Sequence, residues 1–599
     1  MFVTAAFAVA PSPGERTESS AERPRLARKS TDTTEFVSRL HESHRACGCV
    51  CAPRHSRRGP RGGLPFRARC ACGDRHRTQR VGLGLKSQVY GVTVLPAHMP
   101  PVVQLQGVSF KYQGGDSDGL EDVSLTLEAG ELAVVVGASG CGKTTLTRVV
   151  NGLVPRFFEG AFHGTVLIQG QDVSQWSIGQ IGQRVGSVFQ DPRSQFFTTS
   201  ATSEIAFASE HFGVPTELMR RRVDEAFERL EIEALRGRSV FELSTGERQK
   251  VALASAYAMR PSVYVLDEPS ANLDPQATRH LGTIIDLLRQ DGSVVLVAEH
   301  RLYYLAAILD KLIHMRQGRI VEIFDRQALH ALPPSALESR GLRQVDLAQA
   351  RLGTLPHVSR DDIHFQGHDV SLAFGERVVL HGVTAQASRG EVVGLIGRNG
   401  SGKTTFARVA TGLVAQRTGR IRHAYRVLTP EERRKASFFV LQDADYQLYT
   451  ESVIEELMLG LPDTAESRRR ALDTLARFGI DRLSERHPQA LSGGQKQRLT
   501  IAVAAMRHAD VLFLDEPTSG LDATNLQRVG EEIRLLADQG QVVFVISHDY
   551  ELLAQCCPRI LRIDQGRTAA DYRLDLSSAR RLRADLDLPV SPNAAWIWT

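Results

Sequence analysis

The chain has 599 residues, of which 42% are apolar and 24% charged, so it has the composition of a globular protein with room for several domains. Its net charge of +5 is unevenly distributed: residues 1–98 hold 17 Lys and Arg against 7 Asp and Glu, and the remaining residues therefore carry −5. The basic balance is thus no argument for nucleic-acid binding by the main part of the chain. No apolar run reaches the ~18–20 residues that span a bilayer, so work at a membrane would need another chain to cross it.

The N-terminal segment 1–98 predicts a disordered basic extension, because it is rich in Arg, Pro and Cys and has no sustained helical or strand period. Five of the eight cysteines lie there, and the few that remain elsewhere suit a reducing compartment. A second interpretation is that Met99 is the true start of the protein, since a strand-like stretch begins directly after it.

Strands and helices alternate from Val102 onward. The stretch VVQLQGVSFKY alternates like a strand, ELAVVVGASG is an apolar run that ends in glycines, and KTTLTRVVNGL continues as a helix. The same order returns in DVSLAF, EVVGLIGRNG and KTTFARVATGL. Such a repeat predicts two copies of one α/β domain, each with a parallel sheet covered on both faces.

Two pairs of corresponding residues in the two copies are separated by the same number of positions. Asp267 and Asp515 are separated by 248 positions, as are His300 and His548. The first domain is predicted over 99–324 and the second over 361–573. Between them, residues 325–360 predict a short polar linker with a proline pair, and residues 574–599 form a C-terminal tail without an assigned role.

Two glycine-rich loops predict phosphate binding. GASGCGKT (137–144) and GRNGSGKT (397–404) both match G-x-x-x-x-G-K-[ST], in which backbone N–H groups curl around phosphate oxygens at a helix N-terminus. Each follows an apolar strand and precedes a helix, which argues against two chance glycine-rich turns. The predicted ATP-binding residues are Gly137, Ser139, Gly140, Gly142, Lys143, Thr144 and Thr145 in one copy, and Gly397, Asn399, Gly400, Gly402, Lys403, Thr404 and Thr405 in the other.

Within these loops the lysines are expected to reach the β- and γ-phosphates, while Thr144 and Thr404 are expected to ligand Mg²⁺. The apolar runs VYVLDE and VLFLDE each end in an acid pair. A buried strand then delivers Asp267 or Asp515 to the metal beside the phosphate loop. The next residue, Glu268 or Glu516, is placed to accept a proton from the attacking water. An acid pair alone would be interpreted as a solvated turn; behind a phosphate loop it predicts catalysis.

A third motif also occurs twice, as LSTGE (243–247) and LSGGQ (491–495). Together with the phosphate loops and acid pairs, it resembles the signature of the ATP-binding subunits of ABC transporters, over about 102–323 and 361–570. The resemblance implies an ATPase of two tandem P-loop domains. Each would have a mainly parallel sheet core, an antiparallel β subdomain and a helical signature subdomain. In that family two domains pair head to tail, with each ATP between one phosphate loop and the opposite signature.

The resemblance assigns further residues. It implies that Tyr112 and Phe374 stack on adenine, that Gln190 and Gln442 sense the metal and the membrane partner, and that His300 and His548 contact the γ-phosphate. It also matches SANLD (270–274) and SGLD (519–522) to the loops through which the domains touch. The alternatives are a core aromatic at a strand end and a structural histidine.

The head-to-tail pairing of this family, which we call the head-to-tail rule, implies two composite sites whose signature residues differ. The first combines Lys143, Asp267, Glu268 and His300 with Ser492, Gly494 and Gln495, and the second combines Lys403, Asp515, Glu516 and His548 with Ser244, Gly246 and Glu247. The second departs from the family pattern, because Thr245 replaces a glycine and Glu247 a glutamine. We expect both sites to hydrolyse ATP and the second to be slower.

The segments FQDPRSQFFTTSATSEIAF (189–207), LQDADYQLYTESVIEEL (441–457) and AEHRLYYL (298–305) resemble the ATPases of energy-coupling-factor importers. This implies peripheral association with the cytoplasmic face of the cell membrane. The implied partners are a transmembrane coupling protein, docked after Gln190 and Gln442, and a small substrate-binding membrane protein for a vitamin-like micronutrient or a transition metal. The alternatives are an exporter ATPase and a soluble tandem ABC ATPase acting on the ribosome. The short linker and the acidic body disfavour the ribosome, so no nucleic-acid partner is expected.

Cys141 lies within the first phosphate loop at a helix start, which favours a thiolate. We therefore expect alkylation to inactivate the first site and ATP to protect it. The alternative is a small residue that merely fills space.

Overall fold

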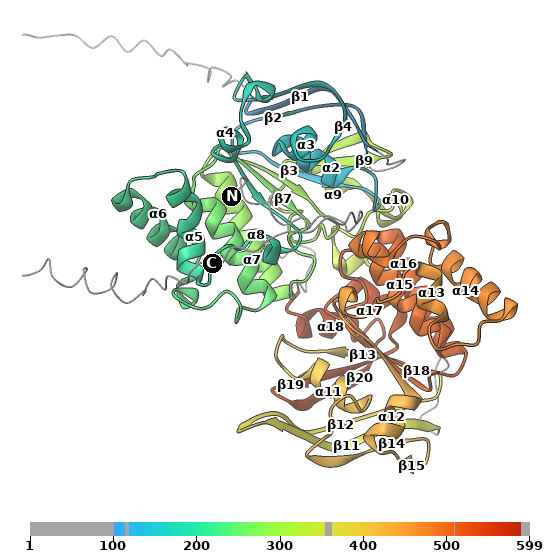
Figure 1. The fold of residues 1–599 in the computed structure, drawn as a ribbon. Helices are drawn as coiled ribbons and strands as arrows, with labels where there is room; N and C mark the ends of the chain where they lie inside the picture. The colour runs from blue at the N-terminus through green and yellow to red at the C-terminus, as the bar shows by residue number, and fades with distance from the viewer. Residues whose placement is uncertain (1–100, 114–118, 354–361, 508, 589–599) are drawn as a thin grey trace, which may run out of the picture. The chain divides into compact units, whose positions relative to one another are not determined.

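A computed structural model describes residues 101–113, 119–353, 362–507 and 509–588 of the chain (Figure 1). The predicted extension 1–98 and the alternative start at Met99 lie outside these residues. Within the described part, the structure confirms two copies of one α/β architecture, each with an antiparallel sheet, a central six-stranded sheet and a helical subdomain.

The first copy contains a four-stranded antiparallel sheet in the order β2-β1-β4-β5 and a central sheet in the order β10-β9-β3-β8-β7-β6. Pairing from β9 to β6 is parallel, and only the edge strand β10 runs antiparallel. The strands are β1 (Val103–Tyr112), β2 (Leu120–Leu127), β3 (Leu132–Val136), β4 (Gly160–Ile168), β5 (Gln171–Asp172), β6 (Val185–Val188), β7 (Val263–Asp267), β8 (Val294–Ala298), β9 (Lys311–Arg316) and β10 (Arg319–Asp325).

The second copy repeats both sheets, as β12-β11-β14-β15 and as β16-β17-β18-β13-β19-β20. Its strands are β11 (Ile363–Phe374), β12 (Arg377–Ser388), β13 (Val392–Ile396), β14 (Thr418–His423), β15 (Arg426–Val427), β16 (Ser437–Val440), β17 (Val511–Asp515), β18 (Val542–Ile546), β19 (Arg559–Asp564) and β20 (Arg567–Arg573). The repeat read from the sequence is thus a repeat of topology.

The helices divide into those that flank the central sheets and those that form the helical subdomains, α5–α7 and α13–α15 (Figure 1). In the first copy they are α2 (Lys143–Val150), α3 (Leu153–Arg156), α4 (Ile178–Gly182), α5 (Ala201–His211), α6 (Thr216–Arg229), α7 (Thr245–Ala258) and α8 (Pro275–Gln290). In the second copy they are α11 (Lys403–Ala410), α12 (Pro430–Ala436), α13 (Val453–Met458), α14 (Ala465–Arg477), α15 (Gly493–Met506), α16 (Ala523–Asp538), α17 (Tyr550–Cys556) and α18 (Ala579–Asp585).

The central strands are apolar throughout because both faces of each sheet are covered. In β3 every residue is buried: Leu132, Val134 and Val136 face a core shared with the helical subdomain, while Ala133 and Val135 face a core shared with the antiparallel sheet. This double burial fixes the strand, so the glycine loop that follows it leaves the sheet at a defined edge.

The connection between the copies differs from the short polar linker that the sequence predicts. It contains α9 (Arg326–Ala331) and α10 (Pro334–Ser339), and Leu329, Leu337, Leu342 and Leu347 are buried. Leu337 and Leu342 join a core of the first copy, whereas Leu347 joins a core of the second. The tail is also partly structured, since Leu582 of α18 is fully buried in the second copy. Isolated leucines in polar surroundings gave no period by which to predict this anchoring.

Candidate functional site

Each glycine-rich loop joins a buried central strand to the helix that begins at its lysine. Gly137 and Gly397 have φ angles of 148° and 146°. A Cβ atom there would lie 2.3 Å from the carbonyl oxygen of Met315 or 2.0 Å from that of Ile563, so only glycine fits. Lys143 Nζ donates to Gly137 O at 2.9 Å, and Lys403 Nζ donates to Gly397 O at 2.6 Å. Both ammonium groups are thereby held at the mouth of the loop.

The predicted metal ligands of each copy lie in contact. Thr144 Oγ1 donates to Asp267 Oδ1 at 3.3 Å, and Thr404 Oγ1 donates to Asp515 Oδ2 at 2.7 Å. The strands β7 and β17 end at these aspartates, beside the start of α2 or α11. A hydroxyl and a carboxylate oxygen from separate elements thus converge, and hard oxygen ligands of this kind suit Mg²⁺.

The glutamates that follow the aspartates have unusual backbone geometry. Glu268 and Glu516 adopt φ angles of 44° and 49°, in the left-handed region that a residue with a Cβ seldom occupies. His300 Nε2 lies 3.4 Å from Glu268 Oε1, and His548 Nε2 lies 3.7 Å from Glu516 Oε1. Backbone strain of this sort persists where surrounding structure enforces it, and it gathers at functional sites.

The two glutamates differ in their electrostatic surroundings. Burial favours the protonated form of Glu268, yet the nearby His300 and Lys143 outweigh it and the pKa of Glu268 is lowered. For Glu516, burial and then the adjacent Asp515 raise the pKa to about 7. In the first copy the raised pKa belongs instead to Asp267, which burial and then Glu268 bring to about 7. The sequence repeats these acid pairs, but the surroundings distribute their charge differently.

The signature serines begin the helices α7 and α15, as the sequence predicts. Ser244 N donates to Glu247 Oε2 at 2.7 Å, and Ser492 N donates to Gln495 Oε1 at 2.9 Å, so both motifs form capping boxes. Glu247 also receives a hydrogen bond of 2.5 Å from Arg238 Nη1. Its carboxylate is therefore engaged in the helix cap and an ion pair, which compensates the charge that distinguishes it from Gln495.

A first cavity of about 830 Å³ contains residues of both copies. From the first copy come the phosphate loop, the acid pair, Tyr112 and Gln190. From the second come Arg486, Ser492, Gly493, Gly494 and Gly520. The cavity therefore joins one phosphate loop to the opposite signature, which is the composite arrangement that the head-to-tail rule predicts.

A second cavity, of about 500 Å³, has the reciprocal composition. The second copy supplies Phe374, Asn399, Gly400, Gly402, Lys403, Thr404, Thr405, Gln442, Asp515, Glu516 and His548. The first copy supplies Ser244, Thr245, Ala271, Asn272, Leu273, Asp274 and Arg301. Thr245, rather than Glu247, is the departure from the family pattern that faces this cavity.

The aromatic and glutamine residues predicted at each site are placed differently in the two copies. Tyr112 is half-buried, and its hydroxyl lies 3.2 Å from Thr145 Oγ1, whereas the ring of Phe374 is 57% exposed. Gln190 Nε2 donates to Glu268 Oε2 at 2.7 Å. Gln442 lines the second cavity. The first site is therefore the more tightly connected of the two.

The loops 270–274 and 519–522 meet across the two copies. Ser519 Oγ donates to Asn272 Oδ1 at 2.6 Å, and the amide of Ser139 donates to Asp522 Oδ2 at 2.7 Å. Among the contacts of the described residues, Asp274 makes no matching bond to Asn399; it caps α8 through Ala277 N. The contact between the two copies, here called the seam, is thus asymmetric: Asp522 binds the first phosphate loop, whereas Asp274 makes no bond to the second among the described residues.

Sequence reasoning missed two residues that line these cavities, namely Arg301 and Arg486. Asp522 lies in the loop 519–522, which was predicted to touch the other domain, although its particular bond to the phosphate loop was not predicted. Arg301 follows the histidine of the first copy, where the second copy has Asp549, so comparison of the repeats position by position would have revealed it. Arg486 carries no motif signal.

The expectation of a thiolate at Cys141 is wrong. Its side chain is 5% exposed, and burial raises the pKa of the thiol, an effect that Lys143 only partly offsets. The residue therefore fills space behind the loop, as the alternative interpretation holds.

The sites described above define an ATPase with two composite nucleotide sites, each completed by the opposite copy. The ABC transporter family matches residues 120–271 and 380–519. A relative from Treponema denticola, a putative ABC transporter ATP-binding protein, is 41% identical over 473 residues, which cover 78% of this chain and 96% of the relative. The chain belongs to the ABC transporter ATP-binding proteins.

Other comparisons extend along the chain. The putative HMP/thiamine import ATP-binding protein YkoD of Bacillus subtilis is 31% identical over 505 residues, covering 78% of this chain and 91% of the relative. A chain in a model of ribosome-bound archaeal Pelota and ABCE1 superposes on this chain with a TM-score of 0.60. The two are 22% identical over 80% of each chain, so the likeness shows a shared fold alone. Within the described ranges, no helix combines the length and apolar character needed to cross a bilayer.

Proposed function

We propose that the chain is the ATP-binding and ATP-hydrolysing subunit of an energy-coupling-factor importer. It powers uptake of a vitamin-like micronutrient or a transition metal through separate transmembrane subunits. The observation that carries the proposal is the likeness to the Bacillus subtilis import protein, which extends over both copies and 91% of that relative. The chain then acts at the cytoplasmic face of the membrane as a peripheral subunit.

At each site the residues have complementary tasks. The phosphate loop and its lysine bind the β- and γ-phosphates, and the paired threonine and aspartate hold Mg²⁺, which neutralises phosphate charge when bound. Glu268 or Glu516 orients the attacking water and accepts its proton. His300 or His548, which lies beside that glutamate, contacts the γ-phosphate. The opposite signature serine closes the site. Because each cavity needs both copies, hydrolysis requires them to be docked.

The surface that meets the membrane partners is proposed to follow the glutamines. Phe197 and Phe241 in the first copy are 41% and 74% exposed, and Tyr446 and Tyr449 in the second are 64% and 76% exposed. Val240 N donates to Thr199 O at 3.0 Å, so the segment bearing Phe241 adjoins the one bearing Phe197. Exposed aromatic side chains close together suit a partner helix with an apolar face.

Affinity isolation of the full chain from detergent-solubilised membranes tests this proposal. We expect a transmembrane coupling protein and a small membrane protein with a bound micronutrient to co-purify. The double variant Phe241→Ala with Tyr449→Ala should lose them, whereas Tyr425→Ala, which removes a ring that is 86% exposed in the turn between β14 and β15, should retain them. Ribosomal subunits in place of membrane proteins, or a permease that exports its substrate, would instead support the two alternatives.

A further inference from the structure

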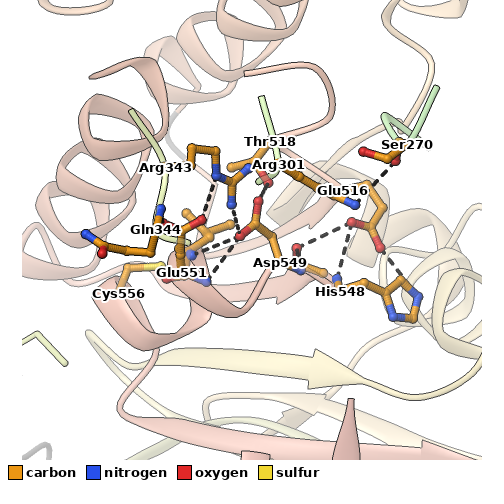
Figure 2. Close-up of polar contacts among 12 residues, drawn as sticks. Ser270, Arg301, Arg343, Gln344, Glu516, Thr518, His548, Asp549, Glu551 and Cys556 are labelled. Carbon is orange, nitrogen blue, oxygen red and sulfur yellow. Dashed lines mark hydrogen bonds and ion pairs between the residues drawn. The ribbon is translucent and has the colours of Figure 1, made fainter. Parts of the chain in front are cut away.

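The connecting segment enters the second copy through one buried arginine. Leu342 packs in a core of the first copy, and the next residue, Arg343, has a side chain that is only 5% exposed. Its guanidinium is bound by two acids of the second copy: Nη2 lies 2.5 Å from Asp549 Oδ1, and Nε lies 2.6 Å from Glu551 Oε2 (Figure 2). The amide of Gln344 donates to Glu551 Oε1 at 3.0 Å. The chain thus passes from one core to the other at a buried cation that is paired with two carboxylates.

Asp549, one of the two acids that bind Arg343, directly follows His548 in the chain. Asp549 Oδ1 also accepts from the amide of Glu551 at 3.2 Å, so Asp549 caps the N-terminus of α17. Its other oxygen accepts from Thr518 Oγ1 at 3.2 Å, in the loop after Glu516 (Figure 2). Although burial favours the protonated form, Arg343 and then Arg301 hold the pKa of Asp549 below its ordinary value. Asp549 is therefore an anion held from three directions.

Asp549 leads directly to the catalytic glutamate of the second site. Its amide donates to Ser547 Oγ at 3.0 Å, and Ser547 Oγ donates to Glu516 Oε2 at 3.3 Å. The amide of His548 donates to the same oxygen at 3.4 Å. A shift of Asp549 would consequently move both hydrogen-bond donors of Glu516, together with the histidine ring beside it.

The first copy has no counterpart of this arrangement among the described residues. The position equivalent to Asp549 is Arg301, whose Nη1 donates to the carbonyl oxygens of Ser270 and Leu273 at 3.4 and 3.3 Å. An arginine there offers Arg343 no anion. The connecting segment therefore acts on one of the two sites.

We propose that Arg343 is a positioning residue for ATP hydrolysis at the second site. By holding Asp549 and Glu551, it sets the loop 547–549 so that Ser547 and His548 face Glu516. The inference rests on the proposed role of Glu516 as the base of that site.

The test measures ATP turnover of the full chain in two backgrounds: Glu268→Gln, which leaves the second site, and Glu516→Gln, which leaves the first. With the second site alone, Arg343→Gln is expected to lower kcat at least about tenfold with KM for ATP changed by less than about twofold, since small misplacements of catalytic groups act on the chemical step. Arg343→Lys should recover part of the loss. With the first site alone, the same variants should change kcat by less than about twofold.

Arg340→Gln is the matched control, because Arg340 lies in the same segment and makes a two-bond ion pair with Glu322 of the first copy. It should leave turnover in both backgrounds unchanged. If Arg343→Gln does not fold, Glu551→Gln tests the same loop with a smaller change and the same expected split.

Equal reductions of kcat in both backgrounds, or a raised KM for ATP with kcat unchanged, would overturn the inference. If instead Glu516→Gln leaves the turnover of an otherwise unaltered chain intact, the proposed role of the second site is wrong. A loss with Glu516→Gln but not with Arg343→Gln or Arg343→Lys overturns the positioning role alone.

Discussion

The bond between Asp522 and the first phosphate loop predicts that the two copies close more firmly over the first site than over the second. Asp522 is 2% exposed and accepts from the amide of Ser139 at 2.7 Å. It also caps α16 by accepting from Asn525 N at 2.7 Å. Asp522→Ala removes both interactions, whereas Asp274→Ala in the first copy removes only the cap of α8, a bond of 2.8 Å to Ala277 N.

The magnitude follows from these contacts. A hydrogen bond to a charged acceptor contributes about 1.5–3 kcal/mol, which corresponds to about a ten- to 150-fold change in the population of the closed state. Loss of the cap costs about 1 kcal/mol and is common to both variants. Asp522→Ala should therefore lower turnover at the first site at least about tenfold more than Asp274→Ala lowers turnover at the second.

The assay is ATP turnover in single-site backgrounds, with Asp522→Ala combined with Glu516→Gln and Asp274→Ala combined with Glu268→Gln. Asp522→Asn is an intermediate variant, because Ser139 N and Asn525 N use different oxygens of Asp522 and the single amide oxygen of asparagine can keep only one of these two bonds, without the charge; its loss should be intermediate. The thermal unfolding temperature of each alanine variant measures the loss of stability that comes from removing its helix cap, which both variants share. Equal reductions by the two alanine variants would refute the reasoning from the asymmetric seam.

Further predictions concern the catalytic bases, one buried histidine and one buried cysteine. Glu268→Gln and Glu516→Gln should each reduce ATP turnover, with less activity remaining in Glu268→Gln because the second site is slower; equal residual rates would contradict this. Burial lowers the pKa of His423 from 6.5 to about 4 in the folded chain. Above pH 6.5 the histidine is neutral in both the folded and the unfolded chain. As the pH falls from 6.5 towards 4, only the unfolded chain binds a proton at this residue, which stabilises the unfolded state. The free energy of unfolding should then fall by about 2 kcal/mol between pH 6.5 and 5, and His423→Phe should remove that part of the slope in denaturant titrations; an unchanged slope is the contrary result. Cys141 should react with an alkylating reagent far more slowly in the folded chain than in guanidinium, as followed by mass spectrometry, and equal rates would show that the thiol is accessible.

The local chemistry of each site could be predicted from the sequence, because its motifs depend on near neighbours. Gly137 and Lys143 belong to one turn between a strand and a helix, so their spacing alone predicts a loop around phosphate. The same holds for Ser244, which begins α7 as a capping residue. Repetition of these motifs predicted two domains, and the resemblance to ABC transporter ATPases implied the exchange of signatures between them.

Other features depended on contacts between segments far apart in the chain. Leu337, Leu342 and Leu347 of the connecting segment are buried because two cores lie on either side of it, and the environment of Arg343 comes from a loop some 200 residues away. The opposite pKa shifts of Glu268 and Glu516 arise in the same way, since the LDEP sequence that both copies share is surrounded by different charges.

What the sequence by itself determined is therefore the kind of chemistry and the number of sites, since short motifs encode local backbone geometry. The inequality of the two sites was decided only by the tertiary structure. Burial and long-range charge act through space, and the partners of Asp522 and Asp549 become neighbours only once the first copy and the connecting segment have docked on the second copy.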